Sequence, residues 1–89
     1  MLLPKLTAEQ KTLASNIEGA VDRDTFVQVM TSNGVSISQQ EDQPEGMLLI
    51  EKGDFFEARR IPVVVRKKLL RRYERKCGIP VSKFYGPIQ

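Results

Sequence analysis

The chain contains no histidine, no tryptophan and only one cysteine in 89 residues. The absence of histidine removes the imidazole base and the His metal ligand, and a single cysteine forms neither an internal disulfide nor a Cys pair for zinc. No glycine-rich phosphate-binding loop is present either. We therefore expect a protein that is not an enzyme and that carries no metal and no other cofactor.

Long apolar runs are also missing. No segment approaches the ~20 apolar residues of a membrane-spanning helix, and the first six residues lack the apolar core of a secretory signal. The lone Cys77 is predicted to be a buried small hydrophobic residue, and free cysteines are typical of the reducing cytoplasm. We therefore expect a cytoplasmic protein without a membrane partner.

The length and composition fit one small globular domain. A chain of 89 residues that is 40% hydrophobic and 28% charged can bury a single modest core. We assign residues 1–89 to this domain, with residues 1–6 as a loose lead. Residues 78–89 form an irregular tail, because Pro80, Gly86 and Pro87 prevent long regular structure.

Charge divides the domain into two parts. Residues 1–58 hold four cations and ten acids, a net charge of −6, whereas residues 59–89 hold ten cations and one acid, a net charge of +9. Such a division is typical of a polyanion partner or of an internal electrostatic clamp. In the clamp hypothesis, the acidic loop that contains Glu41, Asp42 and Glu45 folds against the basic part and occludes it.

Two helices are predicted in the acidic part. Thr7 is a good N-cap and Gln10 completes a capping box, and the apolar spacing that follows predicts a helix over residues 8–20. A second helix follows and ends at Asn33-Gly34, where glycine accommodates a left-handed backbone.

Three strands come next. Residues 35–38 alternate apolar and polar, residues 46–51 form a short apolar run, and residues 54–60 return from a Lys52-Gly53 hairpin turn. The polar stretch at residues 39–45 is predicted to be a loop. With a basic helix at the end, the element order is α-α-β-β-β-α, an α+β fold with an antiparallel sheet.

The predicted turn sets the register of the last two strands. It pairs Met47 with Ala58, and it pairs Leu49 with Phe56. This apolar face is expected to pack against the basic helix. The opposite face carries three further apolar side chains, which we interpret as a candidate homodimer surface: Leu48, Ile50 and Phe55.

The C-terminal helix is predicted over residues 62–77, with Pro62 in its first turn and Gly78 just past its end. One side is apolar, and its residues recur at i+4: Val65, Leu69, Tyr73 and Cys77. The other side carries six cations: Lys67, Lys68, Arg71, Arg72, Arg75 and Lys76. Arg66 is the exception, because it falls within the apolar arc. The pattern is that of a basic amphipathic helix.

Cations along one helix face neutralise phosphates and release counterions, which gives salt-sensitive binding to nucleic acid. Arg59 and Arg60 extend the patch, and Phe84 and Tyr85 are candidate stacking surfaces for unpaired bases. The helix has no Asn, Gln, Ser or Thr to read base edges. The sequence thus predicts a non-enzymatic nucleic-acid-binding domain that contacts backbone phosphates with little sequence specificity. The charge pattern leaves DNA and RNA open, and DNA is favoured over RNA only by the resemblance described below.

Two alternatives remain open. The first is a protein–protein interaction module, an adaptor or inhibitor of phage or plasmid type, which docks its basic face onto an acidic protein. The second is a homodimer formed through the sheet face described above.

One pattern in the sequence resembles a known module. Its residues are Asp24-x-Phe26-x-x-x-Met30-x-x-x-Gly34-Val35-x-Ile37, followed by a hairpin that ends Phe56-Glu57-Ala58-Arg59. Over about residues 8–60, this resembles the small helix–hairpin module that some plasmid mobilisation relaxases carry after their nuclease domain. The catalytic Tyr and the metal-binding His cluster of that nuclease domain have no counterpart here, so no catalytic residue carries over. The resemblance implies an accessory role in DNA processing by a mobile element.

Overall fold

The structure is a computed structural model and describes residues 6–39 and 46–86. Its elements are, in chain order, α1 (Ala8–Ser15), β1 (Val21–Asp22), α2 (Arg23–Ser32), β2 (Ser36–Ser38), β3 (Met47–Lys52), β4 (Phe55–Arg60), β5 (Val64–Val65), α3 (Lys67–Cys77) and the 3₁₀ helix η1 (Val81–Phe84). β2, β3 and β4 form an antiparallel sheet in that order, and β1 pairs with β5. The predicted α+β fold is confirmed, and the β1–β5 pair is an addition to it.

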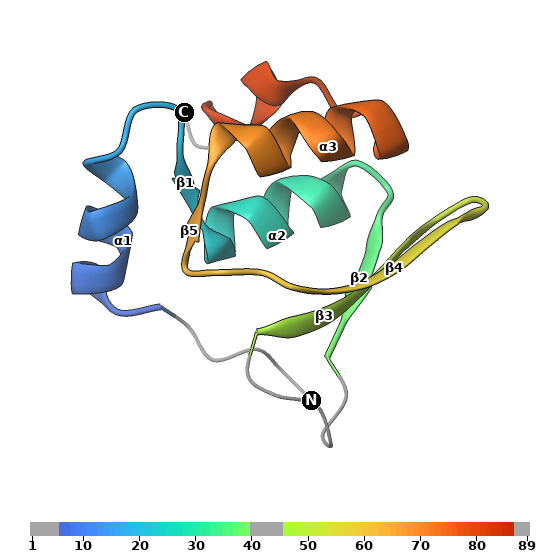
Figure 1. The fold of residues 1–89 in the computed structure, drawn as a ribbon, viewed down its shortest axis with the longest axis horizontal. Coiled ribbons are helices and arrows are strands. Elements are labelled where there is room, and N and C mark those ends of the chain that lie inside the picture. The colour runs from blue at the N-terminus through green and yellow to red at the C-terminus, as the bar shows by residue number, and fades with distance from the viewer. Residues whose placement is uncertain (1–5, 40–45, 87–89) are drawn as a thin grey trace.

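The layers follow from where the apolar side chains point. α2 and α3 lie on the same side of the three-stranded sheet, and α1 lies beside the β1–β5 pair (Figure 1). No described element covers the other side of the sheet (Figure 1). Within the described residues, no helix has the length and hydropathy to cross a bilayer.

The first two helices begin at the residues that local chemistry favours. Thr7 accepts a hydrogen bond from Gln10 N and the capping box is complete, as predicted. Asp22 caps α2 by accepting from Thr25 N at 2.8 Å. Gly34 follows α2 with φ +85°, again as predicted. α1 ends at Ser15, however, and not at residue 20, because the chain turns there to reach β1.

The predicted hairpin register is wrong by two residues. Lys52 belongs to β3 and pairs with Phe55, so the turn residues are Gly53 and Asp54. Leu49 therefore lies opposite Ala58 rather than Phe56. Gly53 still takes a positive φ, +57°.

The predicted packing face is also wrong. Leu48 and Ile50 are fully buried against the helices, whereas Phe56, on the other face, is 61% exposed. Both faces of this hairpin carry apolar residues, so the alternation alone did not decide which face packs. The candidate homodimer surface fails for the same reason: Leu48 and Ile50 belong to the core.

An aromatic cluster lies at the centre of the core. The Phe26 ring lies 5.4 Å from Tyr73 and 5.8 Å from Phe84, measured between ring centroids, and all three side chains are fully buried. Such rings contribute both area and specific pair geometry. The cluster ties α2, α3 and η1 together.

Lys52 links the ends of both core helices. Its ammonium donates to Asn33 O at 3.1 Å and to Cys77 O at 3.0 Å. These carbonyls lie at the C-terminal ends of α2 and α3, where a positive charge complements the helix dipole. A residue predicted to form the hairpin turn therefore fixes the two helices relative to the sheet.

Candidate nucleic-acid interface

The basic helix is shorter than predicted. α3 begins at Lys67 rather than at residue 62, because Val64 and Val65 form β5 and pair with β1. A run of β-branched valines favours a strand over a helix. Arg66 becomes the N-cap residue, in an extended conformation and without a side-chain capping bond.

The buried side of α3 is close to the prediction. Tyr73 and Cys77 are buried, together with Leu70, and Gly78 ends the helix with φ +75°. Burial raises the pKa of the Cys77 thiol. The structure thus confirms Cys77 as a buried hydrophobic residue, and a raised pKa disfavours the reactive thiolate.

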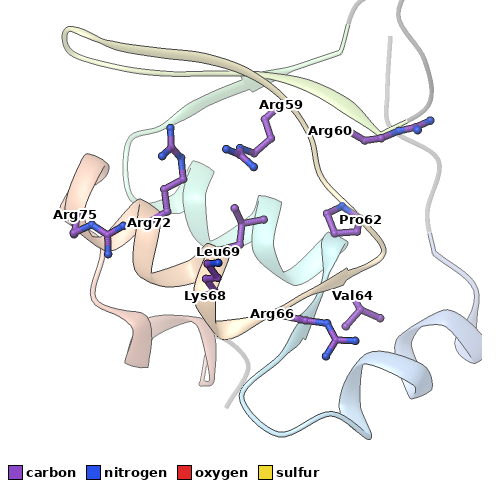
Figure 2. A pocket seen from close by; sticks show the side chains of 9 residues that line it. All are labelled: Arg59, Arg60, Pro62, Val64, Arg66, Lys68, Leu69, Arg72 and Arg75. Carbon is purple, nitrogen blue, oxygen red and sulfur yellow. The ribbon is translucent and has the colours of Figure 1, made fainter.

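Between β4 and α3 lies an open hollow with a volume of about 740 Å³, which we call the basic groove. Figure 2 shows the side chains that line it: Arg59, Arg60, Pro62, Val64, Arg66, Lys68, Leu69, Arg72 and Arg75. Six of these nine are cations, and none of them is acidic. Arg75 lies towards one end of the groove and Arg60 and Arg66 towards the other, with Leu69 between them (Figure 2).

The structure brings together five of the eight predicted cations. Arg59 and Arg60 come from β4, whereas Lys68, Arg72 and Arg75 come from α3. Lys67, Arg71 and Lys76 are exposed but do not line the groove. Three of the six helix cations therefore line the groove, and the other three lie on the exposed side of α3 outside it.

One observation places Lys67 outside the groove. The aliphatic part of Lys67 lies beside Gly19, where an added Cβ would come within 3.4 Å of Lys67 Cδ. Arg71 lies one helical turn from both Lys67 and Arg75 and does not line the groove. The missed groove residue is Arg66. Its position just before the helix frees it from the apolar arc, and the three valines at 63–65 were the signal that could have revealed this.

Glu57 organises one part of the groove. Its carboxylate accepts from Arg59 Nε at 3.1 Å and from Tyr73 Oη at 2.6 Å, and it also pairs with Arg72 Nη2. The Glu57 side chain is 14% exposed, and those of Arg59 and Arg72 are 40% and 32% exposed. One carboxylate thus holds one arginine from each wall, and each guanidinium keeps further N–H donors.

The pKa values follow from this geometry. Burial alone would raise the pKa of Glu57, but the hydrogen bonds from Arg72, Tyr73 and Arg59 together lower it to about 2. Burial and the bond to this carboxylate raise the pKa of Tyr73. The carboxylate is therefore ionised, and the phenol neutral, throughout the physiological range.

This network makes a testable contribution to stability. A carboxyl with a lowered folded-state pKa stabilises the fold above its ordinary pKa near 4.5 and loses that contribution as the pH falls towards 2. Between pH 6 and pH 3, we expect Glu57 to account for a loss of about 2 kcal/mol in unfolding free energy. Urea denaturation at the two pH values measures this. The Glu57→Gln variant should show a smaller pH-dependent loss by that amount, and equal losses in both proteins would contradict the assignment.

Neither predicted stacking residue, Phe84 or Tyr85, lines the groove. Phe84 is fully buried beside Phe26, so its role as a stacking surface is wrong. Tyr85 is 46% exposed but does not line the groove, and its hydroxyl donates to Gly19 O at 2.9 Å. Of these two aromatic residues only Phe84 is buried, because η1 folds back onto the core.

Part of the positive charge of the groove is neutralised by a carboxylate of the protein itself. Arg59 and Arg72 share Glu57, but no acid within residues 6–39 and 46–86 forms an ion pair with Arg66, Lys68 or Arg75. Glu74, the acid of α3, instead accepts from Val81 N at 3.1 Å. The acidic residues of the clamp hypothesis, Glu41, Asp42 and Glu45, lie outside the described residues, so the clamp stays a hypothesis.

In the described part of the chain, no group of three or more Cys, Asp or Glu side chains is placed to hold a metal ion. In comparisons with known proteins, no family model, no curated protein and no solved structure matches the chain. The basic groove is therefore the feature on which a function can be argued.

Proposed function

We propose that this protein is a non-enzymatic nucleic-acid-binding domain that holds a sugar–phosphate backbone in the basic groove. The observation that supports this most directly is the groove itself, with six cations among nine lining residues and no acid among them. A phosphate between the two walls meets cations on both sides, so counterion release drives binding.

The chemistry of the lining residues favours backbone contacts over base reading. Arginine guanidiniums match phosphate oxygens in a bidentate manner. Five of the six lining cations are arginines, and five of the six are carried by β4 or α3. The described lining residues include no Asn, Gln, Ser or Thr. We therefore propose binding with little sequence preference.

Fluorescence anisotropy with labelled DNA oligonucleotides at several salt concentrations tests this function. If four to six phosphates are neutralised, the logarithm of affinity should fall with the logarithm of salt with a slope of about −3 to −4. Micromolar or tighter binding at low salt with such a slope supports the proposal. The absence of micromolar binding, or binding indifferent to salt, contradicts it.

One observation favours a second candidate function. Pro62, Val64 and Leu69 line the groove together with the cations, and an acidic peptide with apolar side chains would fit both kinds of lining residue. In this candidate the protein is an adaptor or inhibitor that docks onto an acidic protein. A pull-down from host lysate with and without nuclease separates the two, because only capture through nucleic acid is lost after nuclease treatment.

The biological setting proposed here is a cytoplasmic accessory factor in DNA processing by a mobile element. It rests on the resemblance of residues 8–60 to the relaxase accessory module and on the preference for DNA that this resemblance implies. The helix–hairpin arrangement of that pattern occurs here as α2 followed by β2, β3 and β4.

A further inference from the structure

We infer that the basic groove takes a single-stranded nucleic acid rather than a duplex. The inference rests on the proposed function, since it names the form of nucleic acid that the same groove holds. It follows from two features of the groove: cations from two facing elements, and apolar side chains among those cations.

The cations stand on two walls that face each other. Arg59 comes from β4 and Arg72 from α3, and Glu57 holds both guanidiniums at once, since it bonds to each of them. The bridging carboxylate is only 14% exposed, whereas the Arg59 and Arg72 side chains are 40% and 32% exposed, so the solvent side of this bridge is formed by the two arginines. A single strand can lie between such walls and be contacted from both sides. The backbone of a duplex is held against its base pairs, so it is open to a protein from the outside only.

The apolar part of the lining suits unstacked bases or sugars. Pro62, Val64 and Leu69 line the groove among the cations, and apolar side chains contact the faces of bases and the carbon edges of sugars. In a duplex the base faces are stacked and hidden, and the grooves display polar edges. A single strand exposes its base faces, which proteins of this kind bind without sequence preference.

Competition between two DNA probes tests the inference on the intact chain. The first probe is a fluorescein-labelled single strand of mixed sequence, and the second is the same strand annealed to its complement. We expect the single strand to bind at least about tenfold more tightly at equal salt, although a duplex carries more charge and releases more counterions per phosphate. Charge alone would therefore give the opposite preference. Equal or tighter duplex binding overturns the inference and leaves the proposed function standing, whereas the failure of both probes to bind overturns the proposed function.

Two matched variants locate the bound strand. Arg75 and Arg71 are exposed arginines one turn apart on α3, but only Arg75 lines the groove. Arg75→Ala should weaken single-strand binding about fivefold and reduce the salt slope by about 0.7, the value for one lost phosphate contact. Arg71→Ala should change single-strand affinity less than about twofold. Equal losses in the two variants would contradict a strand held in the groove. They would indicate that α3 contacts a duplex through Arg71 and Arg75 alike.

Discussion

Replacing Lys68 and Arg75 together by Glu is expected to weaken single-stranded DNA binding about a hundredfold. Both residues line the basic groove from α3. An ion pair at about 4 Å is worth ~1 kcal/mol in water, so the two reversals convert two attractions into two repulsions of similar size. Screening by salt reduces the sum to about 3 kcal/mol, which corresponds to about a hundredfold in affinity. Fluorescence anisotropy at a fixed salt concentration measures the change.

The matched control for this experiment is the double substitution Lys67→Glu with Arg71→Glu. It makes the same change in net charge, on the same helix and with one lysine and one arginine, but at positions outside the groove. We expect the affinity for single-stranded DNA to fall less than about fivefold, because charges outside the groove act on the bound strand only through a weaker, longer-range electrostatic field. If the control loses as much affinity as the groove variant, binding depends on net charge and not on the groove. Circular dichroism of both variants verifies that α3 still forms.

The second large effect concerns the core. Phe26→Ala should lower the unfolding free energy by about 4 kcal/mol, because it removes a fully buried ring that contacts both Tyr73 and Phe84. A chain of 89 residues has a total stability of roughly 4–13 kcal/mol, so the variant is expected to be close to unfolded. Urea denaturation followed by circular dichroism measures the loss. Phe26→Leu, which removes less volume, keeps a folded protein for comparison.

Phe56→Ala is the matched control for the core variant. It makes the same chemical change in β4, on the sheet face that the helices do not cover, where Phe56 is 61% exposed. The expected loss is less than about 0.5 kcal/mol. A loss comparable to that of Phe26→Ala would mean that the sheet presents its other face to the helices, and would contradict the observed register and packing.

Three helix ends were predictable to the residue, although the end of α1 and the start of α3 were not. The Thr7 capping box, Asn33-Gly34 and Gly78 all lie where the sequence placed them. A cap depends on one side chain or one backbone angle within a few residues, so local sequence determines it. The α+β class was predicted for a related reason, since the apolar period of each segment reflects its own geometry.

The pairing of β3 with β4 was not predictable to the residue. A turn at Lys52-Gly53 and a turn at Gly53-Asp54 both contain a glycine that accepts positive φ. The two turns would pair β3 with β4 in registers that differ by two residues. Lys52 is needed at the end of β3, where its ammonium reaches the C-terminal carbonyls of two helices. That requirement exists only in the folded molecule.

The site was predictable as a set of charges but not as a shape. Arg59, Arg60, Lys68, Arg72 and Arg75 were all identified from the clustering of cations, and five of the six groove cations are therefore among the predicted residues. Arg66 was assigned to the apolar arc because the helix was expected to begin at residue 62. The pairing of β5 with β1 delays the helix start and turns Arg66 towards the groove.

By itself the sequence determined the α+β class, the helix caps, the buried side of α3 and the concentration of positive charge after residue 58, because each of these depends on neighbours in the chain. Only the tertiary structure decided which sheet face packs, which cations share a groove and which carboxylate holds two of them. Those features depend on contacts between segments far apart in the chain, such as Glu57 with Arg72 and Val65 with Val21, and no local pattern encodes a distance between such segments.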